Sequence, residues 1–246
     1  MFSLEKLTEG EVLLINKPLR WTSFDVVNKL RSMLTHATGK KLKVGHAGTL
    51  DPLATGLLII CTGKKTTTID EIQSAEKEYT GALTLGATTP SFDLETEPDA
   101  SFPTAHITTE QIHGAAKEFT GTLQQTPPVY SAVKIDGNAA YKYARKGKIA
   151  ELKPREITIS EFEITKIEMT TVSFRIVCSK GTYIRSLADD FGKRLGSGAY
   201  LSSLCRIRIG EFQLKNALTM EQFASEIGAE FSSGKREGSV KKKNFH

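Results

Sequence analysis

The spacing of hydrophobic and polar positions predicts several helices and strands separated by polar turns. Residues 11–16 form a short apolar run typical of a buried strand. The segment 21–23, Trp-Thr-Ser, offers an N-cap, and the helix after it is predicted to continue to about residue 34. Its apolar residues recur at helical spacing: Phe24, Val27, Leu30 and Leu34. Residues 39–43 then close this first strand–helix unit.

The same reading predicts the later elements. Apolar and polar residues alternate with period two in the segment 77–87, which favours a strand. Further strands are predicted at 157–168, at 171–178 and near 204–212, and helices at 109–119, 138–145, 186–195 and 219–226. These elements lack a regular βαβ period, and no strand leads into a GxGxxG turn, so a doubly wound nucleotide-binding domain is not expected. The order favours an α+β fold with a mixed sheet.

The composition is that of a folded, globular protein. The 246 residues are 39% hydrophobic and 25% charged, close to the average for soluble globular chains. No apolar run is long enough to span a bilayer, and the first eleven residues lack the hydrophobic segment of a signal peptide. We therefore expect a cytoplasmic protein without a membrane partner. Cys61, Cys178 and Cys205 are widely spaced, so we interpret each as a small buried residue.

Charge is distributed unevenly. The chain carries 33 Lys and Arg against 28 Asp and Glu, a net charge of +5. Residues 233–246 contribute five basic residues and one acidic residue, so most of that charge lies in a tail that we expect to be flexible. Residues 142–155 hold six basic residues against Glu151, whereas residues 93–99 gather four carboxylates in a predicted acidic surface loop.

The segment 44–58, VGHAGTLDPLATGLL, is the densest candidate for chemistry. Its three glycines allow unusual backbone conformations, and Pro52 stiffens the chain directly after Asp51. Together they could hold one carboxylate in a defined place. Taken alone, the segment also fits an ordinary Asx-Pro turn. A phosphate-binding loop is less consistent with it, because no GK[ST] follows.

Residues 45–58 resemble the signature of the TruB family of tRNA pseudouridine synthases, GHxGTLDPxAxGxL. Further family motifs occur in the same order: Asn16-Lys17-Pro18, Lys77-Glu78-Tyr79 with Leu85-Gly86, Gln125 to Ala132 (QTPPVYSA), and Ser179 to Arg185 (SKGTYIR). The resemblance covers about residues 10 to 220. It implies a pseudouridine synthase fold, with a central, largely antiparallel sheet flanked by helices.

The resemblance implies an enzyme that isomerises a uridine in the T-loop of tRNA, position 55, to pseudouridine. This reaction gains and loses no atom, so no cofactor and no metal are expected. The five scattered histidines agree with that expectation. Asp51 would be the nucleophile or would stabilise charge on C1′, and Arg185 would pair with it. Tyr79 would stack on the base and could remove a sugar proton.

Five more residues are assigned substrate-binding or supporting roles by the resemblance. His46 would enter the space near the flipped base. Tyr183 would help position the base or Tyr79, since on an extended segment it would point to the same side as Arg185. Leu204 matches an apolar position of the uracil pocket. Lys17 would support the Asp51 loop, with possible RNA contact, and Asp93 would contact the base or backbone.

The domain organisation follows from the same comparison. Residues 1–232 are predicted to form the catalytic domain, with an RNA-clamping insertion at about 125–152, and residues 233–246 a basic tail. Many bacterial members continue into a C-terminal RNA-binding domain, for which too few residues remain here. We expect a monomer that binds the tRNA T stem-loop without a guide RNA. The alternatives are a non-catalytic tRNA-folding chaperone and a guide-RNA-dependent relative. A glycosidase lacks an obvious second carboxylate.

Overall fold

In the computed structural model, residues 3–131, 133–135, 138–140, 143 and 152–229 are described. They divide into two compact units: residues 1–75 with 206–246, and residues 76–205. Each unit is an arrangement of antiparallel strands and helices, which confirms the predicted α+β class. No helix in the described ranges is long and apolar enough to cross a membrane.

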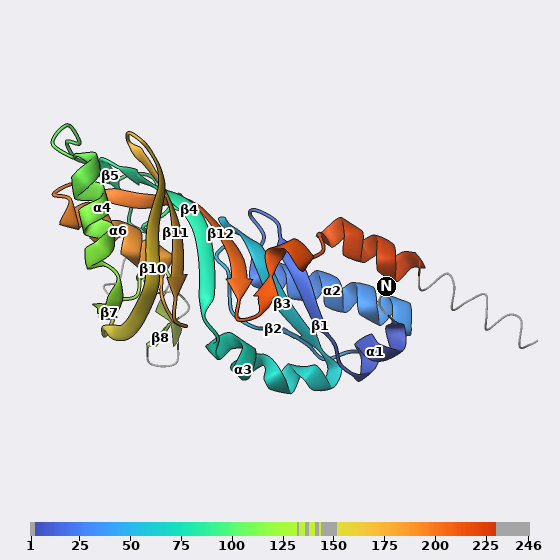
Figure 1. Cartoon of the computed structure of the whole chain (residues 1–246). Coiled ribbons are helices and arrows are strands. Elements are labelled where there is room, and N and C mark those ends of the chain that lie inside the picture. Colours follow the sequence, from blue (N-terminus) through green and yellow to red (C-terminus); the bar gives the residue numbers. More distant parts are fainter. Residues whose placement is uncertain (1–2, 132, 136–137, 141–142, 144–151, 230–246) are drawn as a thin grey trace, which may run out of the picture. The chain divides into compact units, whose positions relative to one another are not determined.

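The first unit is built around β1 and β3 (Figure 1). Its helices are α1 (Leu4–Glu9), α2 (Ser23–Thr38), η1 (Gly63–Thr68), α3 (Ile69–Ser74), η2 (Leu214–Asn216) and a helix at 220–229. Its strands are β1 (Val12–Lys17), β2 (Val44–His46), β3 (Ala54–Thr62) and β13 (Phe212–Gln213). β3 pairs antiparallel with both β1 and β2, and the end of β12 (Ala199–Ile209) pairs with β13.

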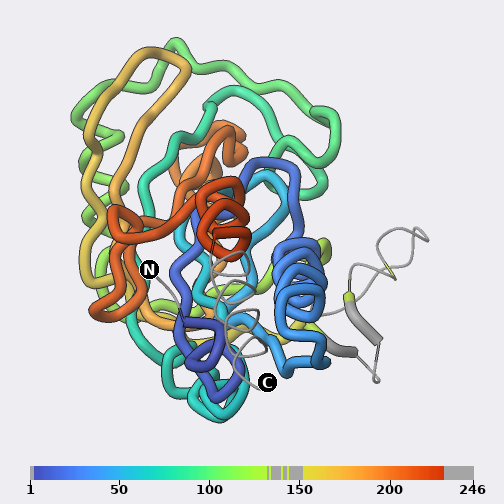
Figure 2. The backbone as a smooth tube through the Cα atoms, turned by 90° about the vertical axis from the view of Figure 1, so that its right-hand side faces the viewer, coloured from blue at the N-terminus to red at the C-terminus, as the bar shows by residue number. Residues whose placement is uncertain are grey.

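Strand β3 is buried along both faces, which explains its unbroken apolar sequence. Leu58 and Ile60 pack with residues of α2 and of the 220–229 helix. Leu57 and Ile59 belong to a second cluster on the other face. Figure 2 shows α2 in blue and the 220–229 helix in red.

Helix α2 begins where its sequence signals predict but ends later. Thr22 and Asp25 form a capping box: the Thr22 hydroxyl accepts the Asp25 N–H, and the Asp25 carboxylate accepts the Thr22 N–H. Gly39 ends the helix in the left-handed region, at φ 69°. The helix runs four residues beyond the predicted end at Leu34. In its last turn the Thr38 hydroxyl donates a hydrogen bond to the Leu34 carbonyl.

The second unit contains a sheet with the strand order β4–β11–β10–β7. Its strands are β4 (Lys77–Leu85), β5 (Ala87–Thr88), β6 (Ala100–Ser101), β7 (Gly121–Gln125), β8 (Lys134–Ile135), β9 (Asn138–Ala139), β10 (Arg155–Glu168) and β11 (Thr171–Cys178). Its helices are α4 (Thr109–Glu118) and α6 (Ile184–Arg194). Phe191 of α6 packs against Phe119 and Phe162, with ring centroids 6.0 and 5.5 Å apart.

Several predictions need correction. The predicted helix at 138–145 begins with two strand residues of β9, because Asn138 pairs with Ile135. Ala140 and Tyr143 are helical as predicted, and the other residues of the segment lie outside the described residues. The last strand begins at Ala199 rather than near Leu204 and ends at a turn before β13. Cys61 and Cys178 are buried as expected, but Cys205 is only half-buried. The basic segment 142–155 lies mostly outside the described residues, as does the tail.

Candidate active site

The Asp51 loop connects β2 to β3 in the first unit and is anchored to the start of α2. The buried Ser23 hydroxyl accepts the Leu50 N–H at 2.8 Å and donates to the Leu50 carbonyl at 3.1 Å. The Ala54 N–H donates to the Asp51 carbonyl, and the Asp51 side chain is half-buried. Gly48 has φ 95°, a conformation that requires glycine. The loop therefore presents one carboxylate from a backbone fixed on both sides.

Lys17, the last residue of β1, is fully buried beneath this loop. Its ammonium group donates to the carbonyls of Pro18, Trp21 and Pro52 at 2.9, 2.6 and 3.4 Å. Burial lowers the pKa of Lys17 to about 8; the charge of Asp51 raises it, and the charge of Arg206 lowers it further. Lys17 thus joins the residues before α2 to the residue that follows Asp51.

Arg206 supports the other side of the loop from β12. Its guanidinium, 1% exposed, donates to the carbonyls of Leu57, Gly48 and Thr49 at 2.8, 3.0 and 3.3 Å. A guanidinium has several N–H donors in a fixed plane, so it can hold three carbonyls in one geometry. Sequence reasoning did not assign Arg206 any role. Arg206 follows Leu204 by two residues on one strand, which was a signal that the two side chains could face the same side of the sheet.

His46 ends β2 just before the loop. Its Nδ1 atom is buried and has no hydrogen-bond partner among the described residues. Burial lowers the pKa of His46, the charge of Arg206 lowers it further, and the backbone of Gly48 acts in the opposite direction. The ring is therefore held in its uncharged form near neutral pH.

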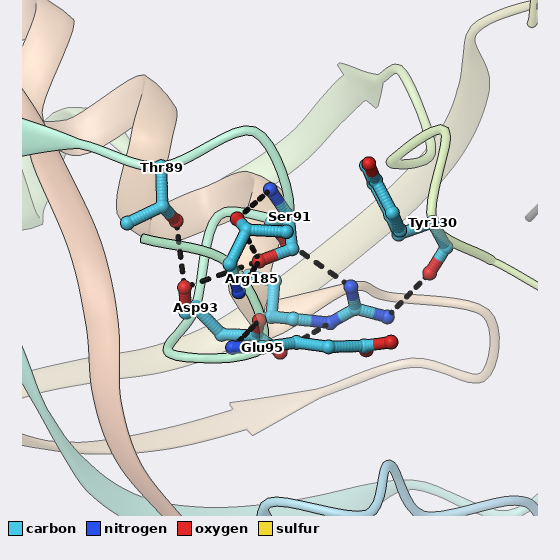
Figure 3. Close-up of polar contacts among 7 residues, drawn as sticks. Thr89, Ser91, Asp93, Glu95, Tyr130 and Arg185 are labelled. Atoms are coloured by element: carbon cyan, nitrogen blue, oxygen red, sulfur yellow. Dashed lines mark hydrogen bonds and ion pairs between the residues drawn. The ribbon is translucent and has the colours of Figure 1, made fainter. Parts of the chain in front are cut away.

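In the second unit, Arg185 lies in the first turn of α6 and is 3% exposed. Figure 3 shows its guanidinium among backbone carbonyls and the Asp93 carboxylate. It donates to the Ser91 carbonyl at 3.1 Å and to the Tyr130 carbonyl at 3.0 Å, and its Nε lies 3.5 Å from Asp93 Oδ2. A cation is unfavourable both near a helix N-terminus and in a buried position. These acceptors offset the free-energy cost of both.

Asp93 corrects the prediction of a wholly exposed acidic loop. It is 4% exposed, and its carboxylate accepts the Glu95 N–H at 2.9 Å in addition to the Arg185 contact. The hydroxyls of Thr89 and Ser91 donate to its carbonyl. Asp93 is therefore a structural partner of Arg185 within the unit, and the remaining acidic residues of the loop, Glu95, Glu97 and Asp99, are exposed.

Tyr183 is not on an extended segment with Arg185, as the sequence suggested, because α6 begins at Ile184. The buried side chain of Gln125 holds the backbone of Tyr183 from both sides: it donates to the Tyr183 carbonyl at 3.0 Å and accepts the Tyr183 N–H at 2.8 Å. Ser186 adds a hydrogen bond to the Thr126 carbonyl. Gln125, which sequence reasoning did not single out, thus joins the end of β7 to the start of α6.

Tyr79 and Leu204 are the remaining candidates of the second unit. Tyr79 lies on β4, 8% exposed, opposite Ile176 of β11. Leu204 lies on β12 and is half-buried. Arg185, Asp93, Tyr183, Tyr79 and Leu204 thus belong to the second unit, and Asp51, His46 and Lys17 to the first. In the described residues, no three His, Cys, Asp or Glu side chains gather in a group that could hold a metal ion.

Comparison with known proteins defines the class. Residues 33–184 match the TruB family pseudouridylate synthase (N terminal domain). The tRNA pseudouridine synthase B of Flavobacterium johnsoniae is 55% identical over 91% of this chain and 98% of its own length. That of Chloroherpeton thalassium is 50% identical over 89% of this chain and 91% of its own.

Two solved structures share this fold. A chain from an H/ACA RNP bound to a substrate RNA containing 2′-deoxyuridine aligns with a TM-score of 0.67 and 25% identity, covering 91% of this chain. A chain of a Cbf5-Nop10-Gar1 complex aligns with a TM-score of 0.67 and 28% identity, covering 92%. This chain spans only 55% and 58% of those two chains.

These matches define an enzyme class, the pseudouridylate synthases, which isomerise uridine. The chain belongs to the TruB family of that class. The family and the α+β fold expected from the ordered motifs are thereby confirmed.

Proposed function

We propose that this chain converts a uridine in the T-loop of tRNA, position 55, to pseudouridine. The Asp51 loop is the main support for this proposal. This segment matches the family signature, and hydrogen bonds from Ser23, Lys17 and Arg206 hold its backbone in place. Relatives named tRNA pseudouridine synthase B, aligned over nearly their whole length, support tRNA as the substrate.

The chemistry needs one well-placed carboxylate. The bond between N1 and C1′ of the uridine breaks, the base turns, and a bond forms between C5 and C1′. The proton on C5 is released, and N1 gains one, so the base composition is unchanged. Asp51 either attacks C1′ or stabilises positive charge there while the base is detached. The fixed loop backbone limits where that carboxylate can lie, which favours reaction through correct placement.

Four residues of the second unit are proposed to take part in the reaction. The family resemblance assigns Arg185 to Asp51, and within its own unit Arg185 is oriented by Asp93 and two backbone carbonyls. Tyr79 stacks on the base and can accept a sugar proton through its hydroxyl, with Tyr183 and Leu204 beside the base. Gln125 keeps the Tyr183 backbone in place.

The target nucleotide must leave its stack before it can meet Asp51. We assign His46 to the space near the flipped base. Because burial and Arg206 keep its imidazole uncharged, the ring can enter among stacked bases without the cost of desolvating a cation. The chain acts as a monomer in the cytoplasm, without a guide RNA and without a cofactor or metal.

Release of tritium from a tRNA transcript labelled at C5 of uridine tests this proposal. The purified chain alone is expected to release tritium from the full-length transcript. It should also release tritium from a hairpin containing only the T stem-loop. Tight tRNA binding without release would instead favour a folding chaperone and would refute the proposed reaction.

Lys17 gives the proposed enzyme a pH dependence. Its pKa of about 8 means that the ammonium group becomes neutral just above physiological pH, leaving two N–H donors for three carbonyl acceptors. We expect kcat to fall as the pH rises through about 8, since the Asp51 loop is then held less firmly. Stability is not expected to fall with it: a lowered lysine pKa means that burial of the charge costs stability below pH 8, and this cost disappears as the pH rises.

The measurement is kcat between about pH 6.5 and pH 9.5 for the wild type and Lys17→Arg, whose guanidinium does not titrate in this range. Melting temperatures at each pH separate loss of activity from unfolding. The same alkaline decline in both proteins would show that Lys17 is not its cause.

A further inference from the structure

The segment between β1 and α2 contains an arginine in a strained conformation. Arg20 has φ 67°, and the described residues contain one other non-glycine residue with positive φ, Phe92. A side chain disfavours this left-handed region, where glycine is the usual residue. Arg20 is held there because its N–H donates to the Pro52 carbonyl at 2.8 Å, and Lys17 binds the carbonyls of Pro18 and Trp21 on either side.

Contacts with the part of the chain that the structure describes do not explain why an arginine occupies this position. Its side chain is exposed and makes no hydrogen bond or ion pair with any described residue. The nearest acidic residue in sequence, Asp25, has its carboxylate bound to the Thr22 N–H at 2.9 Å and to the Thr22 hydroxyl at 2.6 Å. An exposed guanidinium on a rigid and strained backbone segment is instead typical of a residue that binds a ligand.

Exposed apolar side chains flank it. Phe24, in the first turn of α2, is 63% exposed, and Leu19 is 53% exposed. Few large hydrophobic residues in the described part of the chain are this exposed, and these two lie within six residues of each other. Ser23, between Arg20 and Phe24, is hydrogen-bonded to Leu50, so this exposed segment is continuous with the Asp51 loop.

We propose that Arg20 binds a backbone phosphate of tRNA next to the target uridine and that Phe24 packs against a neighbouring nucleotide. The inference rests on the proposed function. If Asp51 reacts at the ribose of that uridine, the phosphates on either side of the ribose must come close to the Asp51 loop. The Arg20 backbone is bonded to the residue that follows Asp51, so its guanidinium is within reach of them.

Arg20→Gly is the sharpest test, because strain and binding predict opposite effects. Removing the side chain relieves the left-handed strain, so the melting temperature is expected to stay the same or rise by up to about 3 °C. Loss of a charged phosphate contact is expected to raise KM for tRNA about tenfold with kcat unchanged. Affinity falls with salt, and between about 50 and 200 mM salt the slope of log affinity against log salt should become less negative by about 0.7 to 0.9.

Two further variants separate the contributions. Phe24→Ser is expected to weaken tRNA binding about fivefold without changing the salt slope, because it removes an apolar contact and no charge. Lys6→Ala removes one positive charge from the exposed surface of α1 in the same unit and serves as the matched control. It is expected to leave both KM and the salt slope unchanged.

The outcomes distinguish this inference from the proposed function. If the wild type releases no tritium from tRNA, the proposed function fails. If the wild type is active but Arg20→Gly keeps the wild-type KM and salt slope, the phosphate contact is refuted. A fall in melting temperature together with a fall in kcat would show that Arg20 has a structural role, which would also overturn the inference.

Discussion

Asp51→Asn is expected to abolish tritium release from tRNA, with a loss of at least about 10³-fold in single-turnover rate. Asparagine has nearly the same size and can still hydrogen-bond, but it has no negative charge with which to attack or stabilise C1′. The loop should keep its structure, because its anchors to Ser23, Lys17 and Arg206 use backbone groups of Leu50, Pro52, Gly48 and Thr49.

Asp70→Asn is the control for this substitution. It removes one exposed carboxylate from α3 in the same unit and should leave the rate unchanged. Binding of tRNA by Asp51→Asn should stay within about twofold of the wild type, since the carboxylate is proposed to act on the reacting carbon rather than to bind RNA. Substantial turnover by Asp51→Asn would remove Asp51 from its proposed role.

Asp93→Asn is expected to lower the free energy of unfolding by about 3 kcal/mol, because it removes a buried carboxylate charge beside the buried Arg185 guanidinium. For a chain of this length that corresponds to a fall in melting temperature of roughly 6 to 12 °C. Urea unfolding measures the change. Activity should fall as well, since Asp93 orients the guanidinium that is proposed to hold Asp51.

Glu97→Gln is the matched control, four residues further along the same loop. Glu97 is exposed, so its substitution should change the free energy of unfolding by no more than about 0.5 kcal/mol. Equal stability of Asp93→Asn and Glu97→Gln would mean that the contact between Asp93 and Arg185 contributes little to the fold. A double-mutant cycle of Asp93→Asn with Arg185→Lys then measures the energy of the pair directly.

The fold was predictable where local signals agree. The N-cap predicted within residues 21–23 is found at Thr22, because its capping box depends on neighbouring residues only. Alternation in β4 likewise identifies Tyr79 and Leu83 as residues of its buried face. These signals depend on residues that are close together in the sequence, so they can be recognised before the three-dimensional structure is known.

The supports of the candidate site were harder to predict, because they depend on contacts between distant segments. Arg206 lies 158 residues from Gly48 in the sequence, and Gln125 lies 58 residues from Tyr183. No local pattern indicates that an arginine on a strand is fully buried or that a glutamine clamps a distant backbone. Asp93 was assigned to a surface loop for the same reason: its burial depends on Arg185 of α6.

The proposed reaction can be located by nucleotide-resolution mass spectrometry on an unmodified tRNA transcript that has been incubated with the purified chain alone. We expect a single new pseudouridine, at position 55 in the T-loop, formed without any guide RNA or added cofactor. An unmodified T-loop, modification at another position only, or a requirement for a guide RNA would contradict it.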